Sequence, residues 1–433
     1  MIKFDFSLNK MGGKRAWITV MLGALFYMYQ FSVRVSPNAM QDNIILAFSI
    51  DAAVFGLIVG CYYIAYSGIQ IPLGLLMDRF GPRRFMSGAS VLCGLACFLF
   101  AFTRNPYIAG MARFMMGLGA ACGFLGTLKL GILWIPQQHI AKVIALTMVM
   151  GTSGALLGGA PLEMLINKIG WDQAFNFLGI IGLLISLIIY IGVRDTPEKE
   201  DIIYEKKSHE KPFVGLKKVL FLPQAWIIST VGMMMYVPLT LFGDAWSKEF
   251  MMRIYSLNEK EALLCSSSML FLGSAVGSPI FTLFSDYMLS RKIPMIIGAV
   301  CALIVHSLIC FITGLPLYVM AILFFLAGFF YTSKCLCFAS ICEIIPDRSI
   351  GGVAIGFTNM IVMQTGVLFH PIFGFLLNYS WNGETILNNK TQTMVPLYME
   401  DDYRFAFSII PICIIIAIFL IIMIKETHPG RHS

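Results

Sequence analysis

Charged residues are scarce in this chain of 433 residues. Asp, Glu, Lys and Arg make up only 13% of it, whereas soluble domains carry about 25%. Hydrophobic residues make up 58%, and the mean hydropathy is +0.78. One water-soluble core cannot hide so much apolar surface. The composition therefore excludes an ordinary soluble protein and predicts a chain whose solvent is largely lipid.

Motifs of enzymes and metalloproteins are also missing. The sequence contains no CxxC pair, no metal-ligand spacing, no nucleotide-binding loop and no paired catalytic carboxylates. The eleven cysteines fall mostly in apolar runs, where they pack as small apolar side chains. We therefore expect no enzyme activity, no metal and no cofactor. The net charge of +7 is no sign of nucleic-acid binding, because the basic residues gather in short loops.

Apolar runs long enough to cross a bilayer recur along the whole chain. A spanning helix needs about 20 predominantly apolar residues. This length predicts spans at residues 16–38, 52–77, 84–103, 106–135, 140–168, 172–193, 223–250, 261–288, 294–313, 316–345, 350–379 and 404–425. We predict an all-α membrane protein of twelve transmembrane helices, divided into a bundle at 1–193, a cytoplasmic linker at 194–222 and a bundle at 223–433.

Basic residues alternate between loops, and the two bundles repeat. Lys and Arg precede the first span, fill the linker and end the chain, which places both termini in the cytoplasm. Asp78 and Arg83 follow the second span, and Asp286 and Arg291 follow the eighth, each 208 positions later. This offset predicts duplication of a six-helix unit.

The sharpest motif is the segment from Gly74 to Arg84, GLLMDRFGPRR. Its glycines permit close helix approach and a tight turn, and its arginines hold the loop on the cytoplasmic side. It resembles the signature loop between the second and third helices of the major facilitator superfamily. The resemblance implies a bacterial inner-membrane carrier that works by alternating access. It assigns a latch between the halves to Gly74, Asp78, Arg79, Gly81, Arg83 and Arg84, with Asp286 as counterpart.

Two further segments carry family patterns. Arg113 opens RFMMGLG, which resembles the family's RxxxGxG pattern and implies coupling or packing more than substrate contact. The fifth span only partly resembles the antiporter signature, because Ala155 stands where that signature has proline. This departure argues against a drug exporter.

A narrower resemblance covers most of the first bundle. Arg34-Val-Ser-Pro37, the tyrosines of the second span and Gly126-Thr-Leu-Lys129 are similar to the bacterial branch that includes the phagosomal amino-acid transporters. Lysosomal dipeptide carriers are more distantly similar. The resemblance implies import of amino acids, small peptides or nucleosides.

Polar side chains inside the spans are the candidates for substrate contact, although each could instead serve internal hydrogen bonding. Spacing places some of them on common helix faces. The candidates are Tyr27, Gln30, Arg34, Tyr62, Tyr66, Lys129, Tyr236, Tyr331, Lys334 and Gln364. Arg34 and Lys334 lead, because buried charge is costly and usually functional.

Charges within the spans are mainly basic, which favours a substrate that bears a carboxylate. The few embedded carboxylates, Glu163 and Asp244, are candidates for proton coupling. The alternative for Glu163 is an ion pair with Arg34 or Arg113, and facilitated diffusion stays open.

The residues and the resemblances together favour a proton-coupled importer of an amino acid or short peptide, and the resemblance to the superfamily implies a monomer. Its expected partners are a small-molecule substrate, protons and the lipid bilayer. An exporter of a metabolite or siderophore is the alternative, and a non-transporting membrane sensor is the alternative of another class.

Overall fold

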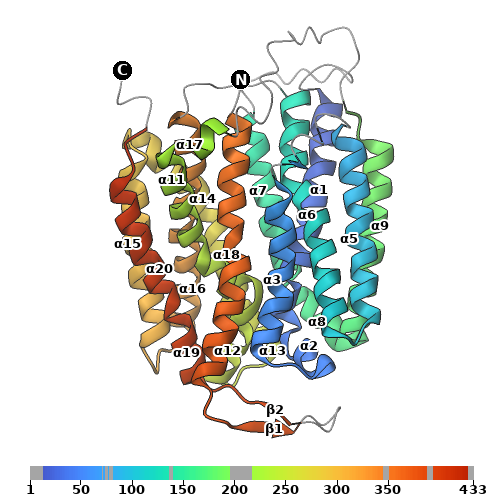
Figure 1. The fold of residues 1–433 in the computed structure, drawn as a ribbon, viewed down its shortest axis with the longest axis vertical. Coiled ribbons are helices and arrows are strands. Elements are labelled where there is room, and N and C mark those ends of the chain that lie inside the picture. Colours follow the sequence, from blue (N-terminus) through green and yellow to red (C-terminus); the bar gives the residue numbers. More distant parts are fainter. Residues whose placement is uncertain are drawn as a thin grey trace.

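Helices make up nearly all of the described chain in its computed structural model (Figure 1). The structure describes residues 13–70, 72–73, 77, 81–135, 140–195, 217–344, 351–387 and 394–427. The N-terminal half, up to residue 195, contains α1 (Lys14–Ala39), α2 (Gln41–Phe48), α3 (Ala52–Gly68), α5 (Pro82–Phe102), α6 (Pro106–Trp134), α7 (Ile140–Leu157), α8 (Ala160–Ile169) and α9 (Trp171–Gly192).

The C-terminal half, from residue 217, has more segments because several of its spans change helix type. It contains α11 (Pro223–Pro238), η2 (Leu239–Trp246), α12 (Ser247–Tyr255), α13 (Glu259–Leu263), η3 (Leu264–Ser268), α14 (Met269–Tyr287), α15 (Lys292–Phe311), α16 (Leu317–Tyr331), η4 (Thr332–Lys334), α17 (Cys335–Ile344), α18 (Gly351–Ser380), β1 (Thr385–Leu387), β2 (Met394–Pro396), α19 (Glu400–Phe407) and α20 (Ile409–Met423).

The helices match the predicted spans. In lipid every backbone polar group must be satisfied within the segment, so apolar runs of this length fold as helices. Eleven helical segments of the described residues are long and apolar enough to span a bilayer, and the bent pair α2 and α3 makes twelve. The pair bends by 114°, so α2 lies across the end of α3. The prediction of a twelve-helix, all-α membrane fold is confirmed.

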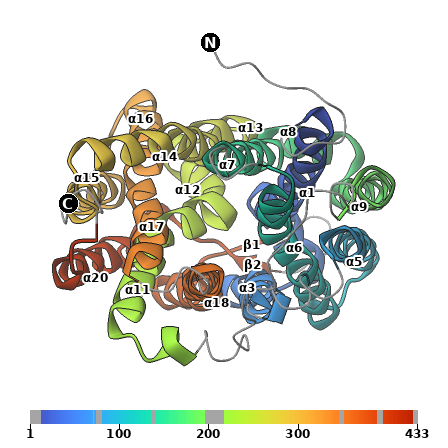
Figure 2. The same ribbon diagram turned by 90° about the horizontal axis from the view of Figure 1, so that it is seen from above.

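The bundle has two distinct ends. In Figure 1, α1 begins and α20 ends at the upper end, called the termini face below. The lower end carries α2, α8, α13 and the β1–β2 ribbon, and is called the hairpin face. Seen from above in Figure 2, the two halves meet where α3 packs on α18 and α7 packs on α14.

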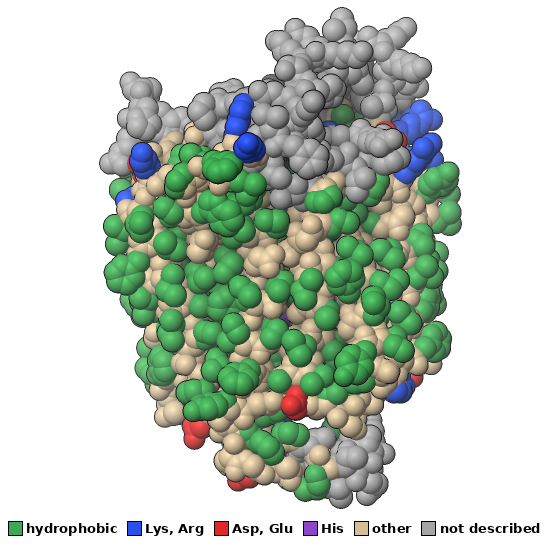
Figure 3. Space-filling view, viewed as in Figure 1, with side chains coloured by type: hydrophobic (Ala, Val, Ile, Leu, Met, Phe, Trp, Pro, Cys, Tyr) green, Lys and Arg blue, Asp and Glu red, His purple; other side chains and the backbone are tan. Residues whose placement is uncertain are grey.

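The sides of the bundle are apolar. Figure 3 shows hydrophobic side chains over the flanks, with Lys and Arg gathered at the rim of the termini face. Exposed examples are Leu184 and Leu187 on α9 and Phe419 on α20. Within the bundle, small residues let helices touch: a Cβ added at Gly154 of α7 would lie 2.0 Å from the Met28 carbonyl oxygen of α1.

Three spans of the described C-terminal half depart from α geometry over part of their length. η2 and η3 are π-helical, and η4 is a 3₁₀ turn. In the N-terminal half, the fifth span breaks at Gly158 and Gly159, between α7 and α8. Such irregular segments recur at functional sites and hinges, so they direct attention to the residues that they carry.

The hairpin face holds two short strands, an element that the sequence analysis did not predict. β1 and β2 pair antiparallel, with Ile386 opposite Val395. The ribbon is anchored by Tyr398, whose hydroxyl donates to Asn378 Oδ1 and accepts from the Ala52 N–H at 3.3 Å. Burial raises the pKa of Tyr398 to about 12, further above neutral pH than that of a free tyrosine.

Similar contacts lie near the ends of the two halves, at positions that the predicted repeat pairs. The Arg83 N–H donates to Asp195 Oδ1 at 2.8 Å, just after α9. The Arg291 N–H donates to Glu426 Oε1, also at 2.8 Å, just after α20. In each half, a carboxylate that follows the last span therefore accepts from the N-terminus of the third span, where helix N–H groups favour an anion.

Candidate functional site

Arg34 and Asp244 form a buried ion pair between the two halves. Arg34 lies near the hairpin-face end of α1, and Asp244 lies in the π-helical segment η2. Arg34 Nη2 is 3.0 Å from Asp244 Oδ2, and Arg34 Nε donates to the same oxygen at 3.3 Å. The two side chains are 4% and 0% exposed, so the pair is removed from solvent.

Two tyrosines complete this cluster. Tyr63 of α3 donates its hydroxyl to Asp244 Oδ2 and accepts from Arg34 Nε at 2.9 Å. Tyr236 of α11 accepts from Arg34 Nη2 at 2.6 Å. The second carboxylate oxygen, Asp244 Oδ1, receives no hydrogen bond from the described residues. The cluster thus joins α1 and α3 of one half to α11 and η2 of the other.

Tyr63 is a site residue that the sequence analysis missed, since it named Tyr62 and Tyr66. The available signal was small residues on the same helix face: Gly56 and Gly60 stand seven and three positions before Tyr63. On that face α3 approaches α18 closely, and a Cβ added at Gly366 would lie 2.1 Å from the Tyr63 ring. Small residues on a membrane helix indicate a packing face, and here that face is the seam between the halves.

The ion pair of Arg34 with Asp244 bears on its predicted contact with substrate. The sequence analysis offered Glu163 as one carboxylate partner for Arg34, but Asp244 is the partner in the structure. Arg34 therefore already has its counter-charge, and its contact with substrate stays a prediction. A substrate carboxylate would have to compete with Asp244 for the guanidinium.

Arg113 of α6 supports this arrangement from behind. Its Nη1 donates to the Val33 carbonyl at 2.9 Å, and its Nη2 donates to the Arg34 carbonyl at 3.3 Å. Its guanidinium also lies over the Tyr62 ring, 4.8 Å from the centroid. These contacts tie α6 to the backbone of α1, and the packing or coupling role that the motif implies stays a prediction.

Lys334 is the second buried cation beside Tyr236. It lies in the 3₁₀ turn η4, is 9% exposed, and places its ammonium 3.6 Å from the Tyr236 ring centroid. Within the described chain it forms no ion pair with a carboxylate. Tyr236 thus stands between two cations, Arg34 and Lys334, of which only Arg34 has a carboxylate partner.

The remaining substrate candidates of α1 and α3 lie in one layer. Tyr62 donates to Gln30 Oε1 at 3.4 Å, and Tyr66 stacks on Tyr62 with centroids 6.0 Å apart. Tyr27 packs against Phe124 of α6 at 5.5 Å. These residues support one another, and their contact with substrate stays a prediction.

Three further candidates come from other helices. Gln364 of α18 donates to Ser67 Oγ of α3 at 3.0 Å, which makes it a contact between the halves. Tyr331 stands beside Tyr236, with centroids 6.3 Å apart. Lys129 is half-buried in α6. The structure therefore brings Tyr331 to the Arg34 cluster and places Gln364 on the seam.

Asn38 forms a second contact between the halves that the sequence did not reveal. Its Nδ2 donates to the Gly243 carbonyl at 3.2 Å and to Ser247 Oγ at 3.3 Å. Its Oδ1 accepts from the Lys248 N–H at 3.3 Å. Nearby, Asn378 Nδ2 donates to Asp51 Oδ2 at 3.0 Å. These contacts lie between the Arg34 cluster and the hairpin face.

The expected latch is described only in part. Gly74, Asp78 and Arg79 lie outside the described residues. Arg83 donates to the Tyr190 carbonyl at 2.7 Å, within its own half, and Arg84 is exposed. The role of these residues as a latch between the halves stays a prediction.

The second copy of this loop is described in full and forms a charge cluster inside the C-terminal half. Arg291 Nη1 lies 2.8 Å from Asp286 Oδ1, and its Nη2 lies 2.9 Å from Glu343 Oε1 of α17. The cluster ties the turn between α14 and α15 to α17. A latch role for Asp286 likewise stays a prediction.

Gly81 is expected to tolerate no side chain. Its backbone has φ +80° and ψ 147°, and an added Cβ would lie 2.7 Å from the Asp195 carboxylate. Gly81→Ala should therefore destabilise the fold by about 1–3 kcal/mol, because this conformation is nearly restricted to glycine. The control is Gly88→Ala on α5, where an added Cβ meets nothing within 4 Å. Thermal unfolding in detergent measures both, and equal stability of the two variants would contradict the expectation.

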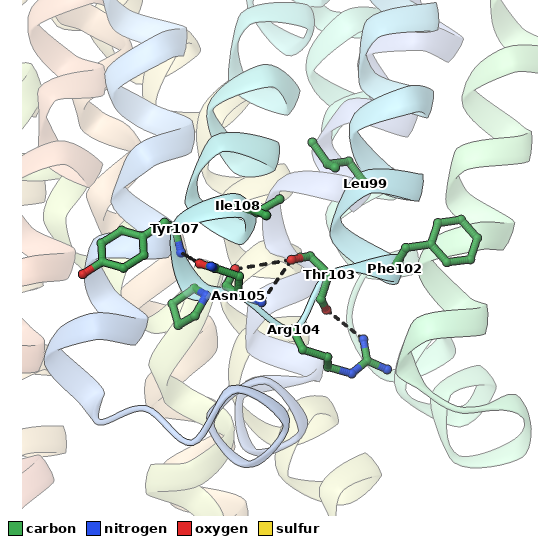
Figure 4. A pocket seen from close by; sticks show the side chains of 8 residues that line it. Leu99, Phe102, Thr103, Arg104, Asn105, Tyr107 and Ile108 are labelled. Carbon is green, nitrogen blue, oxygen red and sulfur yellow. Dashed lines mark hydrogen bonds between the residues drawn. The ribbon is translucent and has the colours of Figure 1, made fainter.

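A surface pocket lies away from this cluster, at the hairpin-face turn between α5 and α6 (Figure 4). Its polar groups bond to one another: the Tyr107 N–H donates to Asn105 Oδ1 at 2.9 Å, and Arg104 Nη1 donates to the Thr103 carbonyl at 2.8 Å. The pocket contains none of the predicted site residues. Its polar groups are used in shaping the turn, so it is a weak candidate for a substrate site.

Comparison with known proteins fixes the family. The family model "Major Facilitator Superfamily" matches residues 17–257, more than half of the chain. The chain belongs to this superfamily. Its helices accordingly fit a multi-pass membrane protein of the major facilitator type, and the superfamily is one of transporters and not of enzymes.

Individual relatives agree with the superfamily. A quinolone resistance transporter of Acinetobacter baumannii is 25% identical over 44% of this chain, which spans half the length of that relative. A probable galactarate/D-glucarate transporter of Escherichia coli K12 is 22% identical over 88% of this chain and 91% of its own length. The hexuronate transporter of that strain is 24% identical over 85% of this chain and 89% of its own length.

A solved structure shares the fold along almost the whole chain. It is a bacterial homolog to the human lysosomal transporter Spinster, in an inward-facing and unoccupied conformation. The TM-score is 0.76 at 16% identity, over 95% of this chain and 97% of the other. This likeness concerns the fold alone. The narrower resemblance to phagosomal amino-acid transporters stays a prediction.

Proposed function

We propose that this major facilitator protein imports a small carboxylate-bearing nutrient across a bacterial inner membrane, coupled to protons. The observation that carries the proposal is the balance of buried charges at and around the Arg34–Asp244 pair. Arg34, Arg113 and Lys334 bring three buried positive charges, and Asp244 brings one negative charge. A buried charge without a partner is expensive, so an anionic substrate fits this centre.

Lys334 is the group that we assign to the substrate carboxylate. Neither Arg113 nor Lys334 has a carboxylate partner among the described residues, but Arg113 donates to two backbone carbonyls of α1. Among the described residues, the ammonium of Lys334 contacts only the rings of Tyr236 and Tyr331. The aromatic rings of Tyr236 and Tyr331 stabilise the ammonium while the site is empty. Binding near the middle of the bundle is the general arrangement of carriers built from repeated halves.

The orientation that we propose places the termini face in the cytoplasm. Exposed basic residues on that face include Lys14, Arg84, Lys217 and Lys425. An excess of Lys and Arg on one side marks the cytoplasmic side of a membrane protein. The hairpin face is then external, and the Arg34–Asp244 and Asn38 contacts close the external side in the present state.

Two substrate classes deserve a direct comparison. Amino acids and short peptides follow from the resemblance of the first bundle. Sugar acids are the second candidate, because the relatives that align over most of the chain are named for galactarate/D-glucarate and hexuronate. Both classes carry the carboxylate that Lys334 would bind.

Uptake into proteoliposomes tests the proposal. Labelled amino acids, dipeptides, sugar acids and a neutral hexose should be offered with and without an inward proton gradient, with protein-free liposomes as the control. We expect saturable uptake of one carboxylate class, enhanced by the gradient. Uptake of the neutral hexose alone would contradict the substrate class. Uptake of a carboxylate that ignores the gradient would contradict proton coupling, and efflux alone would favour the exporter.

A further inference from the structure

A second group of buried charges lies nearer the hairpin face, where α8 of the N-terminal half packs against α13 of the C-terminal half. Lys248 of α12 is fully buried, with its Nζ 3.1 Å from Glu249 Oε1 and 3.9 Å from Glu259 Oε2. Glu163 of α8 is 1% exposed and lies against the carboxyl group of Glu259. These residues are separate from the Arg34 cluster.

Among the described residues, the carboxyl groups of Glu163 and Glu259 lack hydrogen-bond donors that would make their interaction favourable. Asn167 Nδ2 donates to one oxygen of Glu163, Oε1. The other oxygen, Glu163 Oε2, is buried and receives no hydrogen bond from the described residues. Glu259 Oε2 is in the same situation. Two carboxyl groups from opposite halves therefore interact, and each has an oxygen that lacks a donor among the described residues.

Two ionised carboxylates in contact repel each other, and burial makes the repulsion stronger. One proton held between them removes a negative charge and supplies the missing donor to both oxygens. The remaining charge faces Lys248, which already attracts Glu259. The groups that act on Glu163 are Glu259 of α13, Lys248 of α12 and Asn167 of its own helix. Asp42 and Glu249 interact electrostatically with Lys248 and not directly with Glu163.

We propose that Glu163 and Glu259 form a proton-binding site between the halves, and that the bound proton holds the hairpin face closed. Loss of the proton leaves two like charges in contact, and they push α8 and α13 apart. This inference rests on the proposed alternating access, and it adds a site for the proton distinct from the substrate centre.

The sign of the pH dependence follows from proton linkage. The closed state holds one proton more than the open state, in which the two carboxyl groups separate and become hydrated. The ratio of closed to open molecules therefore rises as pH falls, by at most about tenfold per pH unit for one proton. In a proton-coupled importer, arrival of an external proton would favour closure behind the substrate.

Distance measurements across the seam test the site without any substrate. Spin labels on non-natural residues at Lys168 of α8 and Lys260 of α13, both exposed, report the separation of the halves by pulsed electron resonance. In the wild-type chain, the short-distance population should be large at pH 5.5 and should decline by pH 8.5. Glu163→Gln and Glu259→Gln should each abolish this pH response, because an amide keeps a hydrogen-bond donor at every pH.

Asp401→Asn is the matched control, because Asp401 is an exposed carboxylate on the same face, on α19. It should respond to pH as the wild type does. A pH-independent distance in the wild type would overturn the proposal, and so would a full pH response in Glu163→Gln. Because no substrate is present, either result is independent of whether the uptake panel identifies a substrate.

Discussion

Asp244→Ala is expected to destabilise the protein by about 3–5 kcal/mol, because it leaves Arg34 buried without its counter-charge. The two tyrosine hydroxyls around the guanidinium remain, but neither carries a charge. Arg34→Met combined with Asp244→Ala should recover much of the loss, since both charges are then removed together. Unfolding in mixed micelles, titrated with a denaturing detergent, measures the three stabilities.

The control for this prediction is an exposed ion pair in the same chain. Arg104 and Asp172 lie 3.9 Å apart, with side chains 53% and 39% exposed. Asp172→Asn should change the stability by no more than about 0.5 kcal/mol, because water screens such pairs. If Asp244→Ala were as mild as Asp172→Asn, or if the double variant were no better than Asp244→Ala, the buried pair would not be a stabilising contact.

The same variant should also change the balance between conformations. Arg34 and Asp244 belong to different halves, so their contact favours states in which the halves meet toward the hairpin face. Without it, the labels at Lys168 and Lys260 should report a larger open population at every pH. The response to pH should persist, because Glu163 and Glu259 are intact. The two clusters are therefore separable by experiment.

The helices were predictable because one physical requirement decides them. A segment that crosses lipid must satisfy its backbone internally and must be about 20 residues long, and both conditions are readable from an apolar run. The predicted span at 223–250, for example, corresponds to α11, η2 and α12 at Pro223–Tyr255. Its internal change to π geometry was not predictable, since it depends on contacts made after the halves assemble.

Sequence patterns could not predict which side chains of one half contact which side chains of the other. Arg34 and Asp244 are 210 positions apart, and no helical period connects them. The sequence indicated that both charges are unusual, because both lie in apolar spans, but it could not pair them. Glu259 illustrates the opposite difficulty. It stands in the first turn of a helix, where acidic residues are common, so nothing marked it as a partner of Glu163.

The β1–β2 ribbon and the bend between α2 and α3 were missed for a related reason. Both lie where the chain leaves the membrane. The length of an apolar run predicts only the segments that cross the membrane, so it says nothing about these two. The ribbon depends on anchoring contacts such as those of Tyr398 with Asn378 and Ala52. Such contacts join segments that are far apart in the chain. The sequence analysis accordingly predicts no element between the eleventh and twelfth spans.

Lys334→Gln is expected to lower the uptake kcat/KM for the anionic substrate by at least about thirtyfold. Removing one partner of a desolvated, hydrogen-bonded charge pair costs about 2–5 kcal/mol, and each 1.4 kcal/mol is tenfold. The loss should appear mainly in KM, because the ammonium holds the carboxylate before the halves move. Stability should change little, since Lys334 has no described ion-pair partner in the absence of substrate.

Two companion variants make this result specific. Lys334→Arg keeps the charge in the η4 turn and should recover part of the uptake, whereas Lys168→Gln removes an exposed charge at the hairpin face and should leave uptake unchanged. Normal uptake by Lys334→Gln would contradict the assignment of Lys334 to the substrate carboxylate. Arg34 would then be the candidate, and it would have to exchange Asp244 for the substrate. That exchange would make binding and opening of the hairpin face one event, because the same guanidinium would serve both.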